Sequence, residues 1–347
     1  MLLMMFLLNP QAAADDGQTL LVVGSPPCVS TSLSDCEITT DGSFFLGASF
    51  TSSATHAILI RAPHVSLDLN GHTIAHSGSG AAIRIGSPTP TTRTVVRNGH
   101  IHATTGILAD VRSARIEGVQ ITGAQRGIIV DHLDEGTIDI VENVVITDGS
   151  TGAVGVEVIG DCTFFDGCDT SVRMEGNVLT GGELAAAHLR GTTARIDSNV
   201  LKTNEVASSG PVLAMMGGVG SLIEDNLLHG RLGGGACIEN ELANDPLNIH
   251  DTMITDNAMM SCNHGVALTS AERITLLRNY TLNPNLTAYS FSNSSDISAT
   301  FNFVTDANLY QTMSSTTSIF RLGSWGGGGE GTPGGSSVTV SGNLGAP

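Results

Sequence analysis

Apolar and polar positions alternate within residues 126–150 in a pattern that predicts short β-strands joined by tight turns. Ile128 and Val130 are two residues apart and share one face of a strand, whereas Asp131 lies on the opposite face. A second apolar run follows and is interrupted at Asn143, a residue type that tolerates the left-handed backbone of a bend. The segment has no helical period, so we expect strand, turn and strand.

This unit recurs along the chain, and two aligned columns of residues mark it. The first column contains Asn70, Asn98, Gly118, Asn143, Asn177, Asn199, Asn226, Asn257, Asn279 and Asn302. The second is a small residue that opens the first strand: Gly80, Gly106, Gly127, Gly155, Ala186, Gly210, Gly235, Gly265 and Ala288. The columns advance together with a period of roughly 25 residues, which indicates a repeat protein. Short strands at this period predict an all-β parallel solenoid with coils about 4.8 Å apart, so the Asn side chains can hydrogen-bond along their column.

Two segments carry a resemblance to a known superfamily. LDLNGHTI, residues 67–74, looks like a first complete coil, and RNGHIH, residues 97–102, echoes it. With these motifs, residues 56–310 resemble the right-handed parallel β-helix superfamily, which has the pectate-lyase-like fold. The resemblance implies a right-handed, single-stranded parallel β-helix of about ten coils. It also implies that an active site lies on the outer face of one sheet.

The segments outside the array have their own patterns. Residues 1–14 combine a short apolar run with Ala12-Ala13-Ala14 and are similar to a secretory signal peptide. We expect residues 15–55 to form an N-terminal cap, and residues 311–347 a C-terminal cap with a Gly-rich tail in which SSVTVSG is the last strand. No apolar run reaches 18 residues, so the sequence predicts no transmembrane helix.

Six cysteines form three locally spaced pairs: Cys28 with Cys36, Cys162 with Cys168, and Cys237 with Cys262. An even number with this spacing predicts three disulfides made in an oxidising compartment. A zinc site is the alternative, but the cysteines lack the spacing that it needs. We therefore expect a secreted, periplasmic or cell-surface protein.

The net charge of −18 limits the partners of the chain. Nucleic acid would need a basic surface, so it is not an expected partner. A polyanion would need a cation between it and the protein. A polysaccharide remains the expected partner, and the sequence leaves the oligomeric state open.

Ionisable residues gather at the outward positions of the first strand in each unit. Glu157 and His188 are two residues after the opening residue, and Arg84, Asp110, Asp131, Arg190 and Glu239 are four residues after it. His132 follows Asp131. Asp110 and Asp131 would stack about 5 Å apart. Two like charges at that distance cost about 3 kcal/mol at an effective dielectric constant of 20, so in a cleft they need a cation, an arginine or a shared proton.

One hypothesis is a calcium-assisted polysaccharide lyase that works by β-elimination. Asp110, Asp131 and Glu157 would supply hard oxygen ligands for Ca²⁺ from successive coils. Arg190 or His188 would act as base or stabilise charge, which is similar to the arrangement in pectate lyases. The predicted catalytic residues are then Asp110, Asp131, His188 and Arg190, and Arg84, His132 and Glu239 would bind substrate.

Two alternatives stay open. The Asp pair also fits a glycoside hydrolase, whose two carboxyl groups are about 5–9.5 Å apart, depending on its stereochemistry. An adhesin-like scaffold without catalysis would instead leave the acidic cluster as a solvated surface. The first two hypotheses share a β-helix that acts on an extracellular polysaccharide, and the third is a surface or secreted β-helix without catalysis.

Overall fold

In the computed structural model, the described residues are 18–23, 25, 28–86, 93–133, 136–160, 170–204, 210–231, 234–240, 249–282, 284–292, 294–300, 302–305, 309–314, 320–322, 338–340 and 344–345. The statements below concern these residues. Among them, the side chains of residues 132 and 133 and of residues 305 onward are not described.

The described strands form two sheets. Sheet II has 12 strands: β2 (Ser34–Ile38), β5 (His56–Ile60), β8 (Ile83–Ile85), β10 (Thr105–Asp110), β12 (Arg126–Leu133), β15 (Val154–Gly160), β18 (Ala185–Arg190), β21 (Leu213–Met216), β25 (Ile238–Glu239), β29 (His264–Thr269), β32 (Thr287–Ser292) and β35 (Leu309–Ser314).

Sheet I has 26 strands, most coils contributing two of them. They are β1 (Gln18–Leu21), β3 (Gly42–Leu46), β4 (Phe50–Ser52), β6 (Val65–Asp68), β7 (Thr73–His76), β9 (Thr94–Ala103), β11 (Ser113–Ala124), β13 (Gly136–Val141), β14 (Val144–Thr147), β16 (Thr170–Glu175), β17 (Val178–Gly181), β19 (Thr193–Asp197), β20 (Val200–Thr203), β22 (Gly218–Val219), β23 (Leu222–Glu224), β24 (Leu227–His229), β26 (Ile249–His250), β27 (Met253–Thr255), β28 (Ala258–Met260), β30 (Glu272–Leu277), β31 (Tyr280–Leu282), β33 (Ser295–Thr300), β34 (Phe303–Thr305), β36 (Phe320–Leu322), β37 (Val338–Val340) and β38 (Leu344–Gly345).

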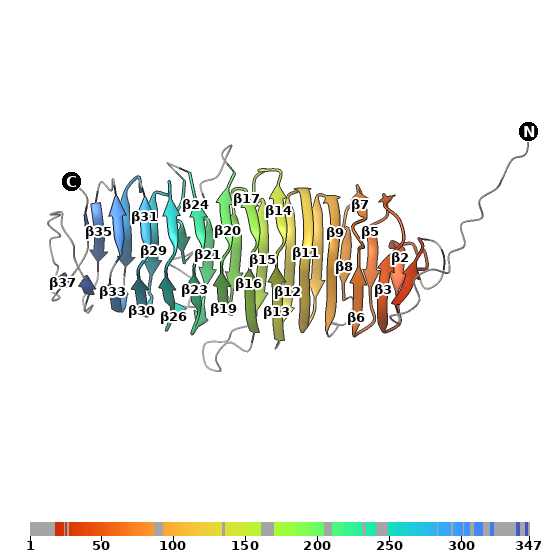
Figure 1. Cartoon of the computed structure of the whole chain (residues 1–347), viewed down its shortest axis with the longest axis horizontal. Helices are drawn as coiled ribbons and strands as arrows, with labels where there is room; N and C mark the ends of the chain where they lie inside the picture. The colour runs from red at the N-terminus through yellow and green to blue at the C-terminus, as the bar shows by residue number, and fades with distance from the viewer. Residues whose placement is uncertain are drawn as a thin grey trace, which may run out of the picture.

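The named strands pair in parallel, each with the equivalent strand of the next coil. Figure 1 shows the result, a long stack of coils with the N-terminal strands at one end and the C-terminal strands at the other. This arrangement confirms the predicted all-β parallel solenoid. None of the described residues forms a helix long and apolar enough to cross a membrane.

The core lies inside the coils. Ile107, Ile128, Val156 and Ala187 are register neighbours on successive strands of sheet II, and each is fully buried. Residues that alternate with them lie on the outer face. The inward rows therefore stack apolar side chains from coil to coil, and each fully buried large side chain contributes about 1.5–3 kcal/mol before entropy is counted.

Buried asparagines form a hydrogen-bonded ladder along one corner of the coils. Its members are Asn143, Asn177, Asn199, Asn226, Asn257, Asn279 and Asn302. In each step the Nδ2 of one Asn donates to the Oδ1 of the next, at 2.8–3.1 Å. The backbone N–H of the same residue donates to the same oxygen, at 2.9–3.1 Å. The predicted stacking of asparagines is confirmed over this part of the column.

The left-handed bend falls on the residue before each ladder Asn from Asn143 to Asn279. Glu142 has a φ of 54°, Asp225 a φ of 53°, and equivalent residues have similar values. Asn98 and Gly118, with φ of 57° and 60°, align with Glu142. The predicted column is therefore wrong by one residue at these two positions. The bend position and the ladder position are adjacent, and an Asn is favourable at either one. An alignment of Asn residues alone therefore places both positions in one column.

The array begins inside the segment that was expected to form the cap. β2, β3 and β4 pair in register with β5, β6 and β7, so the first coil starts at Ser34. β1 pairs with β3 at the end of sheet I. Near the C-terminus, Val338–Val340 forms β37 within the predicted SSVTVSG strand, but β38 follows it, so it is not the last strand. The predicted signal peptide, residues 1–14, lies outside the described residues.

Two of the three predicted disulfides are formed. Cys28 is bonded to Cys36, and Cys237 to Cys262. The second pair joins consecutive coils beside β25. The third predicted pair, Cys162 with Cys168, lies outside the described residues.

Two histidines near the N-terminal end predict a pH-dependent stability. Burial lowers the pKa of His76, on β7, whose two ring nitrogens are buried with no hydrogen-bond partner among the described residues. Burial also lowers the pKa of His56, on β5, against the raising effect of its hydrogen bond with the backbone of Ala81. Asp35 raises the pKa of His76, and Arg84 lowers that of His56. Because the folded state keeps both rings neutral, their contribution to stability is present above the ordinary value of 6.5 and is lost as the pH falls through the lowered pKa values.

We expect the melting temperature of the wild type to fall as the pH is lowered from about 7.5 to about 5. His76→Gln removes one titrating group, so its melting temperature should fall less over this range. His102→Gln, at an exposed position, is the control and should behave like the wild type. Equal slopes for His76→Gln and wild type would show that His76 does not contribute.

Candidate functional site

The outer face of sheet II carries the ionisable residues in two rows. The first row runs in register through Arg84, Leu108, Ile129, Glu157, His188, Ala214 and Glu239. In the second row, Asp110 is in register with Asp131. Farther along the sheet, Ile159 is in register with Arg190, and Arg190 with Met216. The sequence placed Arg84 and Glu239 in the same row as Asp110 and Asp131, which is wrong. Both residues lie in the first row, a shift of two residues along the strand. A shift of two keeps the same face, so both residues still lie outward.

Asp110 and Asp131 are direct register neighbours at the ends of β10 and β12, as the sequence predicts. The Arg84 guanidinium lies 3.7 Å from Oδ2 of Asp110, and both side chains are 18% exposed. The other oxygen of Asp110, Oδ1, is buried and has no hydrogen-bond partner among the described residues. A carboxylate oxygen in this state favours a proton or a cation, because burying it without a partner is costly.

Glu157 and His188 form a buried polar pair in the neighbouring coils, and the half-exposed Arg126 contacts this pair from β12. Glu157 is 6% exposed and His188 is 8% exposed. Oε1 of Glu157 is 3.3 Å from Nδ1 of His188, and Oε2 accepts a hydrogen bond of 2.6 Å from the Arg126 guanidinium. Nε2 of His188 lies 3.1 Å from Sδ of Met216. The geometry fits a His188 ring that donates from Nδ1 to the carboxylate.

The charge state of Glu157 follows from these contacts. The hydrogen bond to His188 and the hydrogen bond and charge of Arg126 hold the pKa of Glu157 below its ordinary value, against the opposite effect of burial. The carboxylate is therefore ionised at neutral pH, and it fixes the orientation of the His188 ring. A carboxylate that orients an imidazole is a common arrangement for general acid–base chemistry.

The remaining predicted residues lie around these two groups. Arg190 is exposed at the end of β18, in register with Ile159 and Met216. Glu239, on β25, lies in the same row as His188, two strands farther along sheet II. His132 lies on β12, directly after Asp131, and its side chain is not described. The roles predicted for these residues stay predictions.

A shallow pocket of about 390 Å³ adjoins the first row on the side where the strands of sheet II begin. It is lined by Thr151, Gly152, Glu183, Leu184, Gly210, Pro211 and Glu239. Glu183 accepts a hydrogen bond from the backbone N–H of Gly152. Because Glu239 belongs both to this pocket and to the row of Glu157 and His188, the pocket extends the candidate site along the helix axis.

Arg126 is a site residue that the sequence did not reveal. Strict alternation along β12 assigns it to the inward set, together with Ile128 and Val130. Arg126 is the first residue of the strand, however, and its half-exposed side chain reaches Glu157 on the next coil. Periodicity describes the middle of a strand, so it gives no signal for a long side chain at the end.

The described residues contain no group of three or more His, Cys, Asp or Glu side chains placed to hold a metal ion. Asp110 and Asp131 offer a pair of adjacent carboxylates, and Oδ1 of Asp110 needs a partner. Glu157 is aligned with Ile129 rather than with Asp131, and its oxygens are already engaged by His188 and Arg126. Of the predicted calcium ligands, only Asp110 and Asp131 are therefore placed to bind a cation. The role of calcium remains a prediction.

Neither a protein-family model nor a curated protein sequence matches the chain. Among solved structures, the chain is similar to the enzymatically active domain of tailspike protein 2 of bacteriophage CBA120, with a TM-score of 0.51 and 11% sequence identity. That alignment covers 91% of this chain and 50% of the tailspike chain, so this chain spans about half of its length. The chain is a right-handed parallel β-helix. At this identity, the likeness concerns the fold alone.

Two further structures align over most of both chains, with lower scores. PfbA, a surface adhesin of Streptococcus pneumoniae, has a TM-score of 0.37 and 11% identity, covering 89% of this chain and 85% of the adhesin. The A-module of the Azotobacter vinelandii mannuronan C-5 epimerase AlgE4 has a TM-score of 0.38 and 9% identity, covering 88% of this chain and 89% of the module.

Proposed function

We propose that this β-helix binds an extracellular polysaccharide on the outer face of sheet II and cleaves it by β-elimination. The observation that carries the proposal is the pairing of Asp110 with Asp131, beside buried Glu157 and His188 and the Arg126 that binds Glu157. The tailspike domain of similar fold is described as enzymatically active, which supports a catalytic role. The two disulfides support a location in an oxidising compartment.

In this proposal, Asp110 and Asp131 hold a divalent cation such as Ca²⁺, which would neutralise a uronate carboxylate of the substrate. The negative net charge of the protein makes such a cation necessary for an acidic polysaccharide. His188, oriented by Glu157, takes the C5 proton next to the uronate carboxyl group. The electron pair of that C–H bond forms the C4–C5 double bond as the C4–O4 glycosidic bond breaks, and the leaving oxygen takes a proton from water. Arg190 and Arg84 supply positive charge for the substrate chain on either side.

Glycoside hydrolysis is a second candidate, and the register of the Asp pair favours it. Neighbouring parallel strands are about 4.8 Å apart, which is close to the separation of about 5–5.5 Å between the two carboxyl groups of retaining enzymes. In this case one Asp acts as nucleophile and the other as general acid, and no cation is needed.

A depolymerisation screen tests the proposal. Purified protein is incubated with polygalacturonate, alginate and neutral glucans, with calcium or with chelator, in parallel with Asp131→Ala. We expect unsaturated products that absorb ultraviolet light, formed by the wild type with calcium and reduced at least 100-fold by chelator or by the substitution.

Other outcomes of the screen would contradict the lyase. New reducing ends without unsaturation, insensitive to chelator, would replace it with the hydrolase. Binding without cleavage, with wild type and Asp131→Ala indistinguishable in products, would leave a polysaccharide-binding scaffold. Arg173→Ala, in an exposed ion pair on sheet I, is the control for effects of surface charge.

A further inference from the structure

A second hollow lies on sheet I, at the corner where the Asn ladder ends. It has a volume of about 360 Å³, which is at the small end of the range for ligand pockets. Two rows of residues from consecutive coils frame it. The corner row is Asn98, Gly118 and Glu142, and the outer row is His100, Gln120 and Val144.

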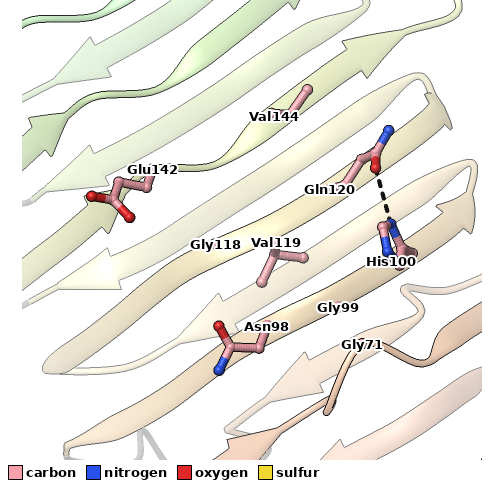
Figure 2. A pocket seen from close by; sticks show the side chains of 9 residues that line it. All are labelled: Gly71, Asn98, Gly99, His100, Gly118, Val119, Gln120, Glu142 and Val144. Atoms are coloured by element: carbon pink, nitrogen blue, oxygen red, sulfur yellow. Dashed lines mark hydrogen bonds between the residues drawn. The ribbon is translucent and has the colours of Figure 1, made fainter.

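The hollow exists because of Gly118. Asn98 and Glu142 lie one coil before and one coil after it, and all three have a left-handed backbone. Since Gly118 has no side chain, the space between the side chains of Asn98 and Glu142 stays open. Figure 2 shows these two residues on either side of Gly118, with Gln120 and His100 along the outer row.

The polar side chains that line the hollow are those of Asn98, His100, Gln120 and Glu142. Nδ1 of His100 donates to Oε1 of Gln120 at 2.9 Å, which leaves the amide N–H₂ of Gln120 as a donor (Figure 2). Among the described residues, Glu142 makes no ion pair, so its carboxylate can accept hydrogen bonds. Nδ2 of Asn98 donates a hydrogen bond of 3.3 Å to Oδ2 of Asp68, whose charge is also paired with Arg97. Among the described residues that line the hollow there is no Lys or Arg, so an anionic ligand is disfavoured there.

The outer row continues beyond the hollow as an apolar surface. Val144 is in register with Val178, which is 39% exposed. A ligand can therefore extend from the hollow along the helix axis, with an apolar surface beside its next unit. A chain of sugars has this combination of hydroxyl groups and apolar C–H faces.

We infer that this corner hollow is a second saccharide site, which binds a neutral sugar unit of a polysaccharide. The carboxylate of Glu142 accepts from the sugar hydroxyls, and the amides of Asn98 and Gln120 donate to them. The inference rests on the proposed function only in taking a polysaccharide as the ligand. The site is separate from the sheet II face, where the cation and the acidic substrate are proposed to bind.

Binding of defined oligosaccharides to the full chain tests the inference. The probes are cellohexaose and mannohexaose, which are neutral, and hexagalacturonate with calcium, which is anionic. Affinity is measured by calorimetry, and contact by saturation-transfer NMR. We expect a neutral probe to bind the wild type and to lose at least tenfold in affinity in the double variant Gln120→Ala, Glu142→Gln.

Matched variants separate this site from the sheet II site. Asp225→Asn is the control for Glu142→Gln, because Asp225 is exposed and has the same left-handed bend position three coils later. Neither Asp225→Asn nor Asp131→Ala should change the affinity for the neutral probe. Circular dichroism verifies that each variant is folded.

Each remaining result has a definite meaning. If neither neutral probe binds the wild type, or the double variant binds as tightly as the wild type, the corner site is wrong. If Asp131→Ala abolishes binding of the neutral probe, the sugar lies on sheet II and the corner site is again wrong. If hexagalacturonate neither binds nor is cleaved while the neutral probe behaves as expected, the proposed function fails and the corner site stands.

Discussion

Replacing Asn199 with alanine is expected to lower the free energy of unfolding by about 3–6 kcal/mol. Asn199 lies in the middle of the ladder, and its Oδ1 accepts from both the backbone N–H and the Nδ2 of Asn177. Its own Nδ2 donates to Asn226 and to the carbonyl of Met174. The substitution leaves two or three buried polar groups without partners, and each costs about 1–3 kcal/mol.

Chemical denaturation followed by circular dichroism measures this loss. Lys202→Ala, at an exposed position of β20, the strand that follows Asn199, is the control and should change stability by less than about 0.5 kcal/mol. A loss below about 1 kcal/mol for Asn199→Ala would show that the ladder does not stabilise the array. Because coils interact mainly with their neighbours, the transition can also become broader when one ladder position is lost.

Replacing Glu157 with glutamine is expected to reduce cleavage of the substrate by about 100-fold or more. Glutamine keeps the size of the side chain but removes the charge that binds Arg126 and orients the His188 ring. Glu157 touches His188 rather than the substrate, so it is a positioning residue. The loss should therefore appear mainly in kcat, whereas Asp131→Ala should also weaken binding in the presence of calcium.

A readout of stability distinguishes this role from a purely structural one. Since the pKa of Glu157 is lowered in the folded state, its contribution to stability is present above the ordinary value of 4.5 and is lost as the pH falls through the lowered pKa. Glu157→Gln cannot titrate, so its melting temperature should fall less steeply below about pH 4.5.

Glu175→Gln is the matched control for this test, because Glu175 forms an exposed ion pair with Arg173 on sheet I. It should change neither activity nor, by more than about 1 kcal/mol, stability. If Glu157→Gln is as active as the wild type and only its stability is changed, the cluster serves the fold and not the reaction.

The candidate site shows where sequence reasoning reaches its limit. Asp110 and Asp131 could be paired from the sequence, because their coils have nearly the same length and the opening glycines align. Arg84 and Glu239 were placed in the wrong row, because the glycines at positions 80 and 235 precede their strands by two extra residues. Faces repeat every two residues, so this error left the predicted surface correct and changed only the neighbours on it.

By itself, the sequence determined the fold and the way its coils repeat. Inward apolar rows, the buried Asn column and the local cysteine pairs of Cys28 with Cys36 and Cys237 with Cys262 all follow from side-chain chemistry that recurs at a fixed spacing. Only the tertiary structure decided which polar atoms meet between coils. The hydrogen bond from Arg126 to Glu157 depends on the length of the arginine side chain, and the hollow at Gly118 depends on the absence of one side chain. Neither feature recurs along the chain, so the repeat pattern of the sequence does not reveal it.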